Sequence, residues 1–146
     1  MKFLVINGPN LNLLGRREPE IYGNRSYAAL CEHIKAAAAK QSIEVEIMQT
    51  NHEGVIVDAI QDALDKYDGI VINPAAYTHT SVAIADAIAA VEIPSAEVHL
   101  SDVDSREAFR RISYVTPACA VRVTGLGFDS YSEAIAQLAT YIRAKS

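Results

Sequence analysis

Residues 2–23 read KFLVINGPNLNLLGRREPEIYG, and this stretch decides the fold that we expect. Phe3–Ile6 is a short, partly β-branched apolar run next to turn residues, which is typical of a buried strand. The segment Asn7–Gly23 then supplies three asparagines, two arginines, two glutamates and a tyrosine. In α/β proteins, ligands bind in the crevice outside the carboxyl ends of the strands. We therefore expect Asn7–Gly23 to form part of an active site.

Apolar β-like runs alternate with helix-like segments along the chain. The expected strands are Phe3–Ile6, Ile43–Met48, Gly69–Ile72, Ile93–Val98 and Ala118–Val123. The expected helices are Ser26–Lys40, Glu53–Lys66, Thr80–Ala90, a shorter one around Ser105–Ile112, and Ser130–Lys145. This alternation predicts parallel βαβ units with right-handed crossovers. Because no repeat or linker interrupts it, we expect residues 1–146 to be a single catalytic domain.

Local signals mark where some of these helices begin. Ser26 is the expected cap of the first helix, and the pattern Ser130-x-x-Glu133 predicts a capping box for the last. The segment Val82–Val91 is almost wholly Ala, Ile and Val, with Asp86 alone in the middle. A helix that is apolar all round needs cover on more than one side, and a neighbouring subunit is one source. Asp86 is then either a solvated polar position or a charge at an interface.

Composition narrows the class of protein and of partner. Half of the 146 residues are hydrophobic, and the formal charge of −5 with no basic run argues against nucleic acid. We expect no signal peptide, because no positively charged start is followed by an apolar run, and no membrane partner, because no apolar stretch is long enough to span a bilayer. Cys31 and Cys119 lack a C-x-x-C pattern, so we expect buried free thiols and a cytoplasmic protein.

Chemically active side chains follow the carboxyl ends of three predicted strands. Asn10, Arg17 and Tyr22 follow the first strand, Asn73 and His79 the third, and His99 and Ser101 the fourth. Alternation places Glu97 and His99 on the same side of their strand. Each set has a structural alternative: a capped helix start near His79, a satisfied core pair at Glu97 and His99, and a solvated helix face at Arg110–Arg111. Three sets meeting at one edge of a parallel sheet favour an active site.

The sequence lacks the residues or motifs that several kinds of enzyme mechanism require. No lysine lies near a strand's carboxyl end, so a Schiff base has no obvious nucleophile. The chain has no G-x-G-x-x-G or G-x-x-x-x-G-K-[ST] motif, and its four histidines lack metal-ligand spacing. We therefore expect no cofactor and no metal, and proton transfer by tyrosine, histidine and arginine.

Three segments resemble, in order, the type II 3-dehydroquinate dehydratases: NGPNLNLLGRREPEIYG, NPAAYTHTSVA and EVHLSDVDSREAFR. The resemblance covers essentially the whole chain. It implies a flavodoxin-like three-layer sandwich with five parallel strands in the order 2-1-3-4-5 and helices on both faces. It also implies a homododecamer of four trimers. The reaction that it implies is removal of water from 3-dehydroquinate by anti elimination through an enolate, without a cofactor.

The resemblance assigns the catalytic roles residue by residue. Tyr22 matches the base that takes the proton from carbon 2, and Arg17 matches the residue that favours its phenolate. Asn10 matches the asparagine that stabilises the enolate through a water. His99, held by Glu97, matches the acid that protonates the departing hydroxyl of carbon 1.

Substrate-binding roles follow from the same match. Asn73, His79 and Arg110 match ligands of the ring hydroxyls and the substrate body. Leu100 and Ser101 match the turn that holds the substrate carboxylate. Asp86 matches an aspartate that reaches the site of a neighbouring subunit.

The chain departs from the family pattern at three positions. Ala75 stands where glycine is frequent, Arg111 where histidine is frequent, and Asp102 where asparagine is common. Asp102 either faces the pocket and repels the substrate carboxylate, or points outward and caps the short helix near Ser105.

Two other classes of protein share such a fold. A flavodoxin-like small-molecule binding module without catalysis needs a hydroxyl- and glycine-rich phosphate loop, where Asn7–Asn12 offers asparagines and a proline. A receiver domain needs acidic residues at the first and third strand ends, where this chain has Asn7 and Asn73.

Overall fold

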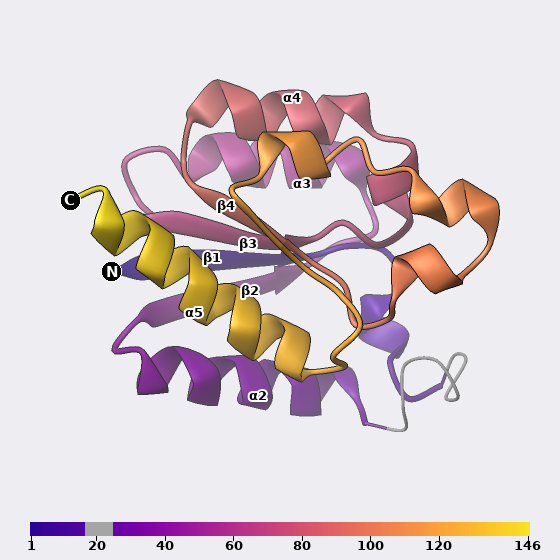
Figure 1. Cartoon of the computed structure of the whole chain (residues 1–146), viewed down its shortest axis with the longest axis horizontal. Helices are drawn as coiled ribbons and strands as arrows, with labels where there is room; N and C mark the ends of the chain where they lie inside the picture. Colours follow the sequence, from indigo (N-terminus) through magenta and orange to yellow (C-terminus); the bar gives the residue numbers. More distant parts are fainter. Residues whose placement is uncertain (17–24) are drawn as a thin grey trace.

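The computed structural model describes residues 1–16 and 25–146, and its centre is a parallel sheet (Figure 1). The strands are β1 Lys2–Asn7, β2 Glu44–Gln49, β3 Gly69–Asn73, β4 Ser95–Val98 and β5 Val121–Val123. All four neighbouring pairs are parallel, and the order across the sheet is β2-β1-β3-β4-β5. The predicted flavodoxin-like architecture and strand order are therefore confirmed.

Helices cover both faces of the sheet. They are α2 Tyr27–Lys40, α3 Glu53–Asp62, α4 Val82–Val91 and α5 Asp129–Ala144. In Figure 1, α2 and α5 lie below the sheet and α3 and α4 lie above it. Short 3₁₀ helices fill the connections: η1 Leu11–Leu13, η2 Ala75–His79, η3 Val103–Ser105, η4 Ala108–Arg111 and η5 Thr116–Ala118.

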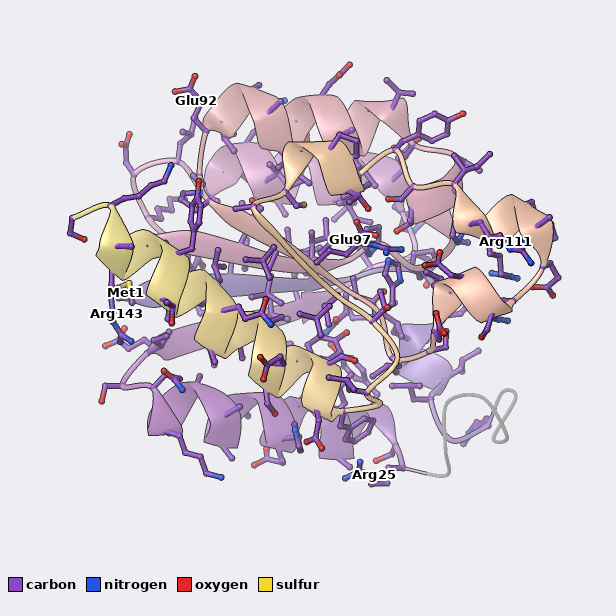
Figure 2. All side chains as sticks on the ribbon, viewed as in Figure 1. Met1, Arg25, Glu92, Glu97, Arg111 and Arg143 are labelled. Atoms are coloured by element: carbon purple, nitrogen blue, oxygen red, sulfur yellow. The ribbon has the colours of Figure 1, made fainter. Side chains whose placement is uncertain are left out.

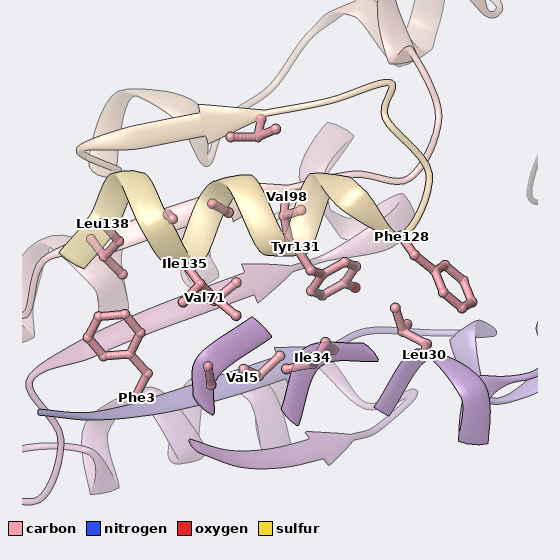
Figure 3. Packing of buried hydrophobic residues seen from close by; sticks show 14 of the residues in the cluster. Phe3, Val5, Leu30, Ile34, Val71, Val98, Phe128, Tyr131, Ile135 and Leu138 are labelled. Atoms are coloured by element: carbon pink, nitrogen blue, oxygen red, sulfur yellow. The ribbon is translucent and has the colours of Figure 1, made fainter. Parts of the chain in front are cut away.

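The core is two hydrophobic clusters, one on each face of the sheet. Successive side chains of β1 belong to different clusters. Phe3 and Val5 belong to the cluster between the sheet and the helices α2 and α5, and Leu4 and Ile6 belong to the cluster between the sheet and the helices α3 and α4. Figure 3 shows the first cluster packed between the sheet and these two helices. The alternation follows from the two-residue period of a strand, so a central strand with helices on both faces is apolar throughout.

One predicted helix cap is confirmed and the other is wrong. Ser26 Oγ accepts a hydrogen bond from the backbone N–H of Ala29 at 3.1 Å, as expected of a helix cap. The helix α5, however, begins at Asp129, one residue before the predicted cap. Ser130 is buried, and its Oγ accepts from the N–H of Leu126 at 2.9 Å. This hydroxyl therefore fixes the turn before the helix instead of capping it.

Other boundaries differ because short 3₁₀ helices take up the ends of the predicted elements. The helix expected from Thr80 begins at Val82, where Ser81 Oγ accepts from the N–H of Ile84 at 3.0 Å. The single helix expected over Ser105–Ile112 is two 3₁₀ helices separated by extended backbone at residues 106 and 107. The helix predicted over Thr80–Ala90 is thus present with slightly different bounds, whereas the prediction of one continuous helix over Ser105–Ile112 is wrong.

The helix α4 has only one covered face in the single chain. Ile84, Ala87, Ile88 and Val91 are buried against the sheet, whereas Val82 is 52% exposed. Asp86 lies on the exposed side. None of the helices among residues 1–16 and 25–146 combines the length and apolar character needed to cross a membrane.

Candidate active site

The candidate site is a pocket at the carboxyl ends of β1, β3 and β4. The predicted site residues that line it are Asn10, Asn73, His79, His99, Leu100, Ser101 and Arg110. Pro9, Leu11, Leu13, Leu14, Ala75, Ala76, Val103 and Arg106 complete the lining. Parallel pairing explains the convergence, because β1, β3 and β4 end at the same edge of the sheet.

The chain leaving β1 passes very close to the chain leaving β3. A Cβ atom added to Gly8 would lie 2.7 Å from the carbonyl oxygen of Pro74, so only glycine fits there. The N–H of Gly8 donates to the carbonyl of Asn73 at 2.8 Å. Asn10 then adopts a left-handed backbone, φ 71°, which asparagine tolerates better than most residues, and its N–H donates to Asn51 Oδ1 at 3.1 Å. These contacts set Asn10 at the pocket's edge.

A buried hydrogen-bond network forms the floor beneath the pocket. The hydroxyl of Tyr131 donates to Asn7 Oδ1 at 2.6 Å and accepts from Asn73 Nδ2 at 3.0 Å. Asn7 Nδ2 donates to the hydroxyl of Tyr27 at 3.3 Å, and Asn73 Oδ1 accepts from the N–H of Ala75 at 3.1 Å. Burial raises the pKa of Tyr27 to about 12 and raises that of Tyr131 as well, so both phenols stay neutral. The network orients the Asn73 carboxamide that lines the pocket.

Glu97 and His99 form a close pair at the end of β4. His99 Nε2 lies 2.6 Å from Glu97 Oε2 and 3.4 Å from Thr78 Oγ1. The carboxylate is fully buried, and Figure 2 shows Glu97 inside the molecule near the strand ends. Burial by itself would raise the pKa of Glu97, but the His99 hydrogen bond and charge, with a Thr116 hydrogen bond, bring it below its ordinary value. The pair is therefore an ionised carboxylate that orients a histidine at the pocket wall.

The pocket is more cationic than the acidic chain that contains it. Arg106 and Arg110 both line it, with 10% and 18% of their side chains exposed. Glu107 lies between them, accepting from Arg110 Nε at 2.7 Å and lying 4.0 Å from Arg106 Nε. His79 Nδ1 donates to the carbonyl of Ile112 at 2.7 Å, which leaves Nε2 for a ligand. Burial and the nearby His99 and Arg110 charges lower the pKa of His79, which favours its neutral form. Such a wall suits an anionic, hydroxyl-rich ligand.

Among the predicted site residues that the structure describes, Asp86 and Glu97 do not line this pocket, and Glu97 acts on it through His99. Asp86 is exposed on α4 and does not line it. Arg17 and Tyr22 lie outside the described residues. The described lining residues include no lysine.

The three departures from the family pattern have different surroundings. Asp102 Oδ1 accepts from the N–H of Asp104 at 3.2 Å and caps η3, which favours the structural alternative for this residue. Ala75 has a left-handed backbone, φ 53°, which explains why glycine suits this position. Arg111 is exposed on η4, away from the described lining, and Figure 2 shows it at the outer end of the molecule.

Sequence reasoning did not identify several residues that shape the site. They are Arg106 in the lining, Tyr131 beneath it, and Ser113 and Thr116 against Glu97. The signal for Arg106 is its place beside Arg110 in the same connection after β4. The hydroxyl residues carry no such signal, because their partners lie on distant elements.

The sheet is open and parallel, and a cationic pocket and a buried carboxylate–histidine pair lie at its strand ends. This arrangement is typical of an α/β enzyme that acts on small oxygen-rich substrates. Residues 1–139 match the family Dehydroquinase class II. The 3-dehydroquinate dehydratase of Clostridium acetobutylicum is 54% identical over 138 residues, 94% of this chain and 96% of that protein. The Fusobacterium nucleatum enzyme of the same name is 52% identical over 97% of this chain and 98% of its own.

Solved structures agree with this match. The crystal structure of the type II dehydroquinase from Butyrivibrio crossotus superposes with a TM-score of 0.92 at 53% identity, covering 94% of this chain and 97% of that one. The chain therefore belongs to the class II dehydroquinase family, and the predicted resemblance and enzyme class are confirmed.

Proposed function

We propose that this chain removes water from 3-dehydroquinate to give 3-dehydroshikimate, in the cytoplasm and as a step of the shikimate or quinate pathway. The reaction is an anti elimination through an enolate and uses no cofactor. The observation that carries the proposal is the Glu97–His99 pair, buried at the wall of a cationic pocket in a chain of this family.

His99 supplies the proton to the departing hydroxyl of carbon 1. The 2.6 Å contact of its Nε2 with Glu97 leaves Nδ1 as the ring nitrogen for the substrate. The Glu97 carboxylate holds the imidazole in one orientation, so that a proton on Nδ1 can pass to the departing hydroxyl. The pair therefore acts as an oriented general acid.

Tyr22 takes the proton from carbon 2, next to the ketone. A free tyrosine has a pKa of about 10, so only about one molecule in a thousand is ionised at neutral pH. Closing that gap requires about 4 kcal/mol. A nearby guanidinium contributes about 1–3 pKa units, and this is the role of Arg17. Asn10, at the pocket's edge, stabilises the enolate through a water.

The remaining lining binds the substrate. Asn73, His79 and Arg110 bind the ring hydroxyls and the substrate body, and all three line the same pocket. Leu100 and Ser101 hold the substrate carboxylate at the turn after β4. In the neutral form of His79, Nδ1 carries the hydrogen that is donated to Ile112, so Nε2 can accept a hydrogen bond from a substrate hydroxyl.

The assembly that accompanies this activity is a homododecamer of four trimers, in which Asp86 reaches the site of a neighbouring subunit. The single chain leaves Val82, Phe109 and Ile112 more than half exposed, and a subunit contact would cover them. Light scattering should report a mass of about twelve chains. A fully active monomer at nanomolar concentration would contradict the shared site.

One assay tests the reaction and its base. Adding 3-dehydroquinate should produce the ultraviolet absorbance of the conjugated enone. Tyr22→Phe should lose activity by several orders of magnitude and still fold, whereas Tyr141→Phe, on α5, should not. If Tyr22→Phe stays within about tenfold of the parent, a barrier change of only about 1.4 kcal/mol, Tyr22 is not the base. A parent that binds substrate without forming the enone would instead be a binding module.

A further inference from the structure

Two hydroxyl groups contact the Glu97 carboxylate in addition to His99. Thr116 Oγ1 donates to Glu97 Oε1, and Ser113 Oγ lies 3.3 Å from both carboxylate oxygens. The carboxylate itself is fully buried, so these two residues and His99 take the place of water around it. The two hydroxyls come from the connection between η4 and β5, which has no role in the proposed reaction.

The geometry of this connection aims both hydroxyls at the carboxylate. Ser113 Oγ accepts from the backbone N–H groups of Val115 at 3.2 Å and Thr116 at 3.0 Å. Since its oxygen already accepts twice, its own hydrogen is left to be donated to Glu97. The N–H of Tyr114 donates to the carbonyl of Thr78 at 2.9 Å, which ties the same segment to η2. The hydroxyls are therefore held in place by backbone contacts on both sides.

We propose that Ser113 and Thr116 are positioning residues for the dehydration, which hold Glu97 as a carboxylate so that His99 keeps the proton it delivers. This rests on the proposed function, in which the His99 proton leaves with the hydroxyl of carbon 1 as water and His99 becomes neutral. Hydrogen bonds donated to the ionised form of a carboxyl favour that form. A protonated Glu97 would have to place its hydrogen where a hydroxyl hydrogen already points.

Other charged and titratable groups act on the same carboxylate. His99 lies on its own strand, and Arg122 on β5 is the register partner of Glu97 and also lowers its pKa. Cys119 is uncharged, because burial and then the Glu97 charge raise the pKa of its thiol to about 12. His79 on η2 is favoured in its neutral form. Arg122 is thus a permanent cation near Glu97, and each hydroxyl adds to its effect.

The test replaces the Thr116 hydroxyl by a methyl group of nearly the same shape. In Thr116→Val, the titration midpoint of Glu97 should rise by about one pH unit, so kcat should fall by up to about tenfold at pH values below the new midpoint, with KM within about twofold. Thr116→Ser, which keeps the hydroxyl, should restore both. Thr140→Val, an exposed position on α5, is the matched control and should change neither.

The midpoint is read directly by ¹³C NMR of glutamate carboxyls, with the Glu97 signal assigned by its loss in Glu97→Gln. An unmoved midpoint in Thr116→Val, or a rise in KM with kcat unchanged, would overturn the positioning role. If Thr116→Val does not fold, Ser113→Ala should shift the midpoint in the same direction, and an unmoved midpoint there overturns it equally. A parent without turnover would refute the proposed function, while the midpoint still decides the role of the hydroxyls.

Discussion

Removing one hydroxyl from the pocket floor tests whether the buried network stabilises the fold. In Tyr131→Phe, Asn7 Oδ1 and Asn73 Nδ2 lose the partners that they contact at 2.6 and 3.0 Å. Both asparagines and Tyr131 are almost completely buried, so water cannot replace the hydroxyl at low cost. Each buried polar group left unpaired costs about 1–3 kcal/mol, which gives a loss of about 3 kcal/mol for the pair. For a chain of this length the midpoint of thermal unfolding should fall by about 10 °C.

Urea denaturation at fixed protein concentration measures this loss, because assembly makes apparent stability depend on concentration. The slope m should stay unchanged, which shows that the variant unfolds from the same structure. Tyr141→Phe is the matched control, since its ring lies against Lys145 at the end of α5 and takes no part in the network. A change below about 0.5 kcal/mol in Tyr131→Phe would mean that the asparagines find other partners, and the reasoning from buried unpaired groups would be refuted.

Three further predictions follow from single residues. Ala75→Gly should stabilise the fold by about 0.5 kcal/mol in urea denaturation. Relief of about 1–2 kcal/mol of left-handed strain exceeds the entropy cost of glycine, which is about 0.4–1 kcal/mol, and a less stable variant would contradict this reasoning. Asp102→Asn should leave KM unchanged at low salt, because this side chain caps η3, and a several-fold lower KM would restore the repulsive role. The lowered pKa of His79 means that the unfolded chain binds its proton first, so the free energy of unfolding should fall as pH drops below about 6.5. His79→Gln should flatten that part of the pH curve, and an unchanged slope would assign it to other groups.

Regular elements were predictable because burial on both faces of a central parallel sheet forces an apolar, β-branched pattern. The five strands lie within or beside the predicted runs, and the three strand ends do meet at one pocket. Strand order came from the family resemblance instead, since periodicity alone does not distinguish one arrangement of βαβ units from another. Arg17 and Tyr22, outside the described residues, remain predictions.

Irregular segments were less predictable, because long-range contacts there outweigh local preference. Ser130 fits a capping pattern but accepts a hydrogen bond from the preceding turn, and the one helix expected around Ser105–Ile112 is replaced by the two 3₁₀ helices η3 and η4. The hydroxyls beneath the site have partners far along the chain: Thr116 is 19 positions from Glu97, and Tyr131 is 58 from Asn73. No local pattern in the sequence indicates such pairs.

The bond between Asn7 and Tyr131 joins residues that are 124 positions apart, near the two ends of the chain. During synthesis the first strand leaves the ribosome long before α5, so Asn7 Oδ1 and Asn73 Nδ2 have no Tyr131 hydroxyl to bind until that helix has emerged. Contacts of such large sequence separation slow folding, because the loop they close must be ordered first. The pocket floor is therefore among the last parts of the molecule to be completed, and a nascent chain that stalls before α5 has the strands but lacks a finished floor for its site.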